Sequence, residues 1–308
     1  MISRSALIYL SEREGLKDFA TRFRPFKKLT TRFVAGESID EAVDAIKRIN
    51  ADGCSASFDH LNESVTSEAE AAAEVREYLN ILEQIDNAGI RSNVSIKLTQ
   101  FGLGIDQELA YQNARTVVVD AARRKTFVRV DMEGSDVTQK TIDIFKRLRA
   151  EFGLDDVGIV LQSYLYRTFA DAEDLLKIPA RIRICKGAYS EPPDVAYAAK
   201  SDTDENYIRV MKLLLSSGVY HGIATHDPKM IAATMDHARK ESIGKDKFEF
   251  QMLYGIRRDL QTQLARDGYN LRVYVPYGKH WYPYFMRRLA ERPANIWFIL
   301  RNLLKDRL

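Results

Sequence analysis

Short apolar runs alternate with longer segments of helical period from about residue 53 to the end of the chain. The longer segments repeat their apolar positions every three or four residues, as residues 67–89 do before ending at Gly89, which is typical of amphipathic helices. Most of the short runs contain β-branched residues, and all of them are predicted to be strands. These runs are residues 54–59, 93–98, 127–132, 157–162, 181–186, 219–225, 248–253 and 271–276. The chain therefore repeats a strand and helix unit eight times.

This alternation implies parallel strands joined by crossover helices, and eight units in about 250 residues predict a (βα)₈ barrel. An open doubly wound sheet is less favoured, because residues 102–104 supply two glycines but the third position of the dinucleotide fingerprint is Gln107. We expect the barrel over residues 51–308 and a helical segment over residues 1–50. The last helix of this N-terminal segment is predicted to begin at Ser38, which lies three residues before Glu41 and forms a capping box with it.

Charge is nearly balanced over the 308 residues, with 46 basic and 43 acidic side chains, which argues against a general nucleic-acid binder. Residues 1–34 differ, with eight basic and three acidic side chains. Within them, residues 22–33 interleave phenylalanines with basic side chains. This stretch is either a binding arm for nucleic acid or anionic lipid, or a helix face packed against the barrel.

Two cysteines, Cys54 and Cys185, each lie in an apolar run and form no disulfide framework, which indicates a reducing, cytoplasmic setting. No apolar run approaches the roughly 18–20 residues that a membrane-spanning helix needs. The N-terminus lacks the layout of a signal peptide. We expect a cytoplasmic protein that at most contacts a membrane surface.

Polar side chains fall at the predicted C-terminal ends of the strands, where barrel enzymes hold their chemistry. They are Asp59, Lys97, Asp131, Gln162, Arg183, Lys186, Thr225, His226, Gln251 and Tyr274. Cations and hydrogen-bond donors dominate this set and suit an anionic, ring-bearing ligand with phosphates. The five histidines show no metal-ligand spacing, so no metal is expected. One alternative is a Schiff-base lyase or aldolase that uses Lys97 or Lys186 as its amine nucleophile.

The last predicted helix carries Tyr284, Arg287, Arg288 and Glu291 at a spacing that places them on one face. Two neighbouring arginine forks make a strong receptor for the carboxylate of an amino or keto acid. The alternative is a surface ion pair between Arg288 and Glu291, worth a few tenths of a kcal/mol. The spacing by itself leaves both interpretations open.

Several segments, in order through most of the barrel, resemble the proline dehydrogenase family, including the proline dehydrogenase part of bifunctional proline utilization A. The segments are residues 58–63, 94–99, 128–135, 160–164, 183–189, 223–227, 248–256, 272–278 and 282–295. The resemblance implies a distorted (βα)₈ barrel that uses FAD, in preference to FMN, to oxidise L-proline to Δ1-pyrroline-5-carboxylate by hydride transfer. It also implies a membrane quinone as electron acceptor, with a separate pyrroline-5-carboxylate dehydrogenase downstream, because the chain looks like a monofunctional member.

The resemblance also implies roles for individual residues. Arg287, Arg288 and Lys97 would bind the proline carboxylate, and Asp131 would orient them. The residues expected to enclose the proline ring are Tyr189, Leu253, Tyr274 and Tyr284. The residues expected to hold the flavin are Gln162, Arg183, Lys186, Gly187, Thr225, His226, Gln251 and Glu291. Arg183 would stabilise the reduced ring.

A gate over the site is implied by the family motif "LGE", whose glutamate corresponds to Glu63 and would pair with Arg287. This chain has Asn62 where the motif has glycine. Asparagine is the non-glycine residue that best tolerates positive φ. The bulk of the Tyr274 phenol is expected to favour proline over hydroxyproline.

Overall fold

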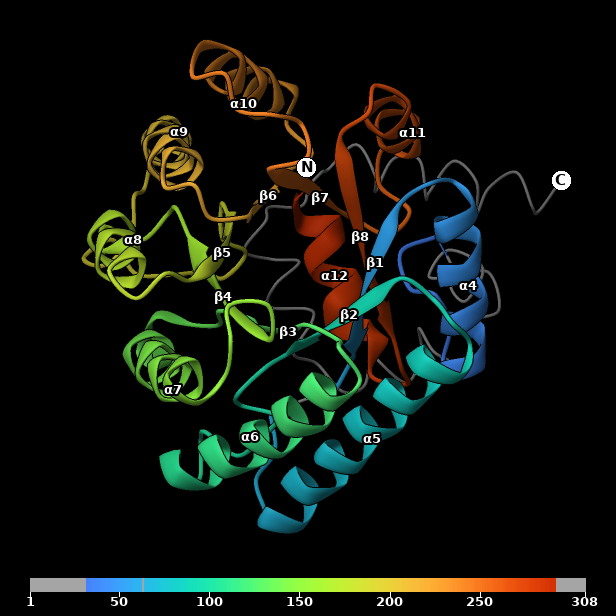
Figure 1. Ribbon diagram of the computed structural model, residues 1–308. Coiled ribbons are helices and arrows are strands. Elements are labelled where there is room, and N and C mark those ends of the chain that lie inside the picture. The colour runs from blue at the N-terminus through green and yellow to red at the C-terminus, as the bar shows by residue number, and fades with distance from the viewer. Residues whose placement is uncertain (1–31, 63, 292–308) are drawn as a thin grey trace, which may run out of the picture.

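Eight parallel strands close into a barrel in the order β1 to β8 in the computed structural model, which describes residues 32–62 and 64–291 (Figure 1). The strands are β1 (Ser55–His60), β2 (Ser92–Ile96), β3 (Val128–Val130), β4 (Val157–Gln162), β5 (Arg181–Cys185), β6 (His221–Ala224), β7 (Phe248–Leu253) and β8 (Asn270–Tyr277). β1 closes the barrel against β8, with Phe58 opposite Val275. The predicted (βα)₈ barrel is confirmed, although β3 is three residues long where six were predicted.

Helices surround the barrel and alternate with the strands, whereas the last helix projects onto the middle of the ring of strands in the view of Figure 1. They are α4 (Ile39–Ala51), α5 (Glu68–Asn87), α6 (Gln107–Arg123), the 3₁₀ helix η1 (Ser135–Val137), α7 (Thr138–Glu151), α8 (Thr168–Leu176), α9 (Lys200–Ser216), α10 (Pro228–Lys240), α11 (Arg258–Arg266) and α12 (Trp281–Glu291). α4 begins with the predicted capping box between Ser38 and Glu41. Residues 1–31 of the expected N-terminal segment lie outside the described residues.

The barrel interior holds a polar core, because alternate residues of a strand point to opposite faces and the inward positions of several strands are polar. Arg129 of β3 precedes Asp131 by two residues and lies with Arg183, Glu249 and Arg272 inside the barrel. Arg272 precedes Tyr274 in the same way on β8. Arg272 Nε lies 2.8 Å from Glu249 Oε1 of β7, and its NH1 donates to the Ala56 carbonyl at 2.7 Å. Many barrels fill this level with Val, Ile and Leu. Here an internal ion pair ties β7 and β8 to β1.

His221 of β6 is fully buried and links its strand to β5. Its Nδ1 accepts a hydrogen bond from the Ile182 amide at 3.1 Å, and its Nε2 lies 2.9 Å from the Ser217 hydroxyl. Burial, supported by the nearby positive charge of Arg129, lowers the pKa of His221 from 6.5 to about 3. The folded protein therefore holds a neutral imidazole over the whole neutral range.

Stability is expected to fall as the pH drops from about 6.5 towards 3, because an unfolded histidine gains a proton that folded His221 cannot hold. Its contribution approaches about 1.4 kcal/mol per pH unit at most. His221→Gln can keep both hydrogen bonds and does not titrate. Urea unfolding between about pH 6 and pH 4 should give a shallower pH slope for the variant. Equal slopes would contradict a neutral His221.

Candidate active site

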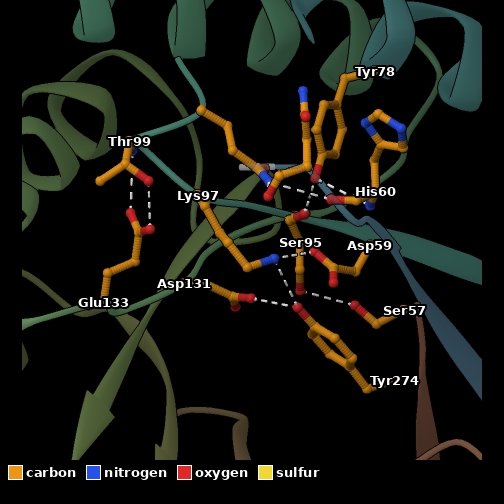
Figure 2. Close-up of polar contacts among 12 residues, drawn as sticks. Ser57, Asp59, His60, Tyr78, Ser95, Lys97, Thr99, Asp131, Glu133 and Tyr274 are labelled. Carbon is orange, nitrogen blue, oxygen red and sulfur yellow. Dashed lines mark hydrogen bonds and ion pairs between the residues drawn. The ribbon is translucent and has the colours of Figure 1, made fainter. Parts of the chain in front are cut away.

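Five charged and polar side chains, three within strands and two directly after strands, form a continuous network at the C-terminal end of the barrel. Lys97, which follows β2, is paired with Asp59 of β1 and donates to the hydroxyl of Tyr274 at 3.4 Å. That hydroxyl donates to Asp131 Oδ2 at 2.7 Å, and Arg183 of β5 donates to Asp131 Oδ1 at 2.8 Å. Figure 2 shows the Tyr274 hydroxyl between Lys97 and Asp131. The structure thus brings together strand-end residues that are far apart in sequence.

Lys97 keeps its positive charge in this network. Burial lowers its pKa, but attraction to Asp59 and Asp131 outweighs burial and leaves the pKa above its usual value. Burial, together with the same two carboxylates, raises the pKa of Tyr274 well above 10, so its phenol stays protonated as a donor. A charged ammonium suits the binding of a substrate carboxylate. It does not suit attack on a carbonyl, which argues against Lys97 as a Schiff-base nucleophile.

Arg183 is 6 % exposed and is held on three sides. Besides Asp131, it donates to Gln251 of β7 and to the Ser95 hydroxyl of β2 at 3.2 Å. Its guanidinium carbon also lies 5.3 Å from the centroid of the Tyr274 ring. These contacts fix the direction of a buried positive charge before any ligand arrives.

Supporting residues one step deeper in the barrel escaped the sequence analysis. The Ser95 hydroxyl lies 3.0 Å from that of Ser57, and Gln251 donates in turn to Glu249. Gly222 leaves room for this arrangement, because a Cβ there would lie 2.5 Å from Gln251 Nε2. The sequence contained a signal for these supporting residues, namely the two-residue period of a strand. Ser57, Ser95 and Glu249 each precede by two positions a polar residue that was predicted at the end of a strand.

The expected flavin residues other than Glu291 lie in or directly after β4, β5, β6 and β7. Gln162 donates to the Met132 carbonyl at 2.9 Å, while its Oε1 is buried without a hydrogen-bond partner among the described residues. Lys186 lies 2.8 Å from Asp227 Oδ2. The Thr225 hydroxyl accepts from the Asp227 amide at 3.0 Å. The buried acceptor on Gln162 and the nearby cations fit a ligand that carries both a polar ring and phosphates.

His226 and Gly187 have local structural reasons for their identity. His226 Nε2 accepts from the Leu253 amide at 2.8 Å, which holds the loop after β6 against the end of β7. Gly187 has φ +108, and a Cβ there would lie 2.1 Å from the Tyr164 ring. Only glycine fits that position, whatever ligand lies beside it.

Helix α12 holds the tyrosine and arginine that were predicted to share one face. Tyr284 is 6 % and Arg288 8 % exposed, and the Arg288 guanidinium carbon lies 5.2 Å from the centroid of the Tyr284 ring. Burial raises the pKa of the Cys185 thiol at the end of β5 to about 12, and the positive charges of Arg183 and, to a smaller extent, Arg288 oppose this rise. This burial contradicts the alternative of a surface ion pair for Arg288. The side chains of Arg287 and Glu291, and all of Glu63, lie outside the described residues.

Two further findings concern the described residues alone. No group of three His, Cys, Asp or Glu side chains in ranges 32–62 and 64–291 is arranged to hold a metal ion. Across those same ranges, every helix is too short or too polar to cross a bilayer.

Comparison with known proteins gives consistent matches along the chain. A family model described as proline dehydrogenase matches residues 42–301. Proline dehydrogenase 2 of Bacillus subtilis is 41 % identical over 305 residues, covering 99 % of this chain and 100 % of that protein. Proline dehydrogenase of Deinococcus radiodurans is 42 % identical over 305 residues, covering 98 % of each chain.

A solved structure shows the same barrel. Proline utilization A from Bdellovibrio bacteriovorus, inactivated by N-propargylglycine, superposes with a TM-score of 0.80 at 26 % identity. The match covers 86 % of this chain and 32 % of that longer chain.

Proposed function

This chain belongs to the proline dehydrogenase family, and on that premise we propose that it oxidises L-proline to Δ1-pyrroline-5-carboxylate with FAD as cofactor. The observation that carries the proposal is the charged Lys97, held at the barrel mouth by Asp59, Asp131 and Tyr274. Such a group suits a small carboxylate-bearing substrate.

The substrate carboxylate is bound by Lys97, Arg287 and Arg288. Asp131 orients this set through Tyr274 and through Arg183. The proline ring is enclosed by Tyr189, Leu253, Tyr274 and Tyr284. Proline must lose a proton from its ring nitrogen, and the chain otherwise contributes mainly by positioning the substrate and excluding water.

The flavin is held by Gln162, Arg183, Lys186, Gly187, Thr225, His226, Gln251 and Glu291. When bound, it supplies the acceptor for the hydride that leaves the carbon next to the proline nitrogen. Arg183 presents a fixed positive charge that favours an electron-rich ring. We propose FAD rather than FMN, because the donors continue past the interior residues to Lys186 and Thr225 beyond the ends of β5 and β6.

Electrons pass from the enzyme to a membrane quinone, and a separate pyrroline-5-carboxylate dehydrogenase takes the product. We propose that the enzyme is cytoplasmic and that the basic residues near its N-terminus make weak contact with the membrane surface. Liposome flotation of the full chain and of a variant without residues 1–34 tests this contact. Equal flotation of the two proteins would rule out this membrane contact.

Glu63 is proposed as the gate over the site.

The absorption spectrum of the purified protein before and after anaerobic addition of L-proline tests the main proposal. We expect a flavin spectrum that bleaches with proline. A colourless protein, or a flavin spectrum that proline leaves unchanged, would refute it. Covalent trapping of a keto acid by borohydride at Lys97 or Lys186 would instead support the Schiff-base alternative.

Tyr274→Ser is expected to relax the choice between proline and hydroxyproline. Removing the phenol leaves room for a hydroxyl on the substrate ring, so the ratio of kcat/KM for proline over hydroxyproline should fall roughly tenfold. Tyr274→Phe is the matched control, because it keeps the ring and loses only the hydroxyl with its hydrogen bonds to Asp131 and Lys97. If the serine variant keeps the wild-type ratio, the phenol does not select the substrate.

A further inference from the structure

The loop between β5 and α9, residues 186–199, is anchored at both ends by main-chain hydrogen bonds to the segment that follows β4. The Tyr164 amide donates to the Lys186 carbonyl at 3.0 Å, and the Tyr197 amide donates to the Tyr164 carbonyl at 2.8 Å. The Tyr166 amide donates to the carbonyl of Val195 at 3.1 Å. Main-chain contacts therefore fix where this loop begins and where it ends.

The middle of the loop carries Tyr189 and is held by a side chain, Glu191. The Glu191 carboxylate accepts a hydrogen bond from the Ser135 amide at 2.9 Å and another from the Ser135 hydroxyl. It also accepts from the Tyr164 hydroxyl at 3.2 Å. One carboxylate thus connects three loops, those that follow β3, β4 and β5.

Each of the three loops carries, or packs against, residues expected to bind the substrate or the flavin. Ser135 lies four residues after Asp131, the centre of the charged network. The Tyr164 ring fills the space where any side chain at position 187 would have to go. Glu191 is two residues from Tyr189. A shift of Glu191 would move groups expected to touch the substrate and the flavin.

The same arrangement occurs one loop earlier. Glu133 accepts from the Thr99 amide at 3.1 Å and from the Thr99 hydroxyl, which ties the loop after β3 to the loop after β2 (Figure 2). In both cases a glutamate accepts the amide and the hydroxyl of one Ser or Thr in a neighbouring loop. Repetition of this contact around the rim indicates a means of fixing loops relative to one another.

We propose that Glu191 is a positioning residue, which sets Tyr189 and Gly187 against the loops after β3 and β4 and so tunes proline affinity. The inference rests on the proposed function, because it assumes that Tyr189 encloses the proline ring. Glu191 itself acts through the residues it holds. Misplacement of a binding group by about 1 Å can change rates roughly a hundredfold, so the effect on substrate binding should be measurable.

Steady-state kinetics of the flavin-loaded full chain test this role. Glu191→Ala should raise the KM for proline about tenfold or more and leave kcat within about twofold. Glu191→Gln keeps one acceptor oxygen and should give an intermediate KM. Ser135→Ala should raise KM by a smaller factor in the wild type, and by none when Glu191 is already alanine. Asp194→Asn alters an exposed carboxylate of the same loop and should match the wild type.

The outcomes separate this inference from the proposed function. A wild type that leaves its flavin oxidised with proline refutes the function itself. A wild type that oxidises proline, with Glu191→Ala lowering only the melting temperature and leaving KM unchanged, refutes the positioning role alone. The positioning role is also refuted if Ser135→Ala raises KM by the same factor whether position 191 is glutamate or alanine. If Glu191→Ala does not fold, Glu191→Gln and Ser135→Ala decide the question.

Discussion

Replacing Asp131 with alanine is expected to lower the free energy of unfolding by about 3–5 kcal/mol and to remove most of the activity. Arg183 is 6 % exposed and would lose its carboxylate partner at 2.8 Å while remaining buried and charged. The hydroxyl of Tyr274 would lose its acceptor at 2.7 Å. Breaking a buried ion pair from one side is costly, because the remaining charge has neither water nor a counter-ion.

Urea unfolding measured alongside a surface control gives the comparison. Asp236→Ala breaks an ion pair of 2.6 Å with Arg239 in which both side chains are more than half exposed, so its loss should stay below about 1 kcal/mol. Asp131→Asn keeps an oxygen for Tyr274 and should lie between the two. The prediction is wrong if Asp131→Ala is no less stable than Asp236→Ala.

Arg288→Met is expected to weaken proline recognition by about 2 kcal/mol or more, a rise in KM of roughly thirtyfold. Methionine preserves the apolar contact with Tyr284 and removes the guanidinium, so the loss reports on the charge. The same change at Arg287 is expected to have an effect of the same scale. Steady-state kinetics with L-proline measure both.

Arg258→Met on α11 is the matched control for the Arg288 variant. Arg258 also lies over a tyrosine ring, 5.5 Å from the centroid of Tyr254, but its side chain is exposed whereas that of Arg288 is buried. Its replacement should leave the KM for proline unchanged. A wild-type KM in both arginine variants of α12 would rule out the proposed carboxylate clamp.

The strands were predictable because most of them are short runs that contain β-branched residues, and such a run is a local feature of the sequence. The helix at Ser38 was predictable for the same kind of reason, since a capping box acts over three residues. The pairings among the polar residues beneath the rim were not predictable. Ser57 and Ser95 look alike as isolated hydroxyls, and only barrel closure brings them within 3.0 Å.

Taken alone, the sequence determined the barrel, the order of its units and the identities of the polar residues at strand ends, because period and composition are local properties. The tertiary structure decided which of those residues pair. Asp131 meets Tyr274, 143 positions later in the chain, and Glu191 meets Ser135, 56 positions earlier. Such pairings depend on how far each strand is shifted against its neighbours and on where each loop packs. Those quantities come from the packing of the whole barrel, so no local pattern contains them.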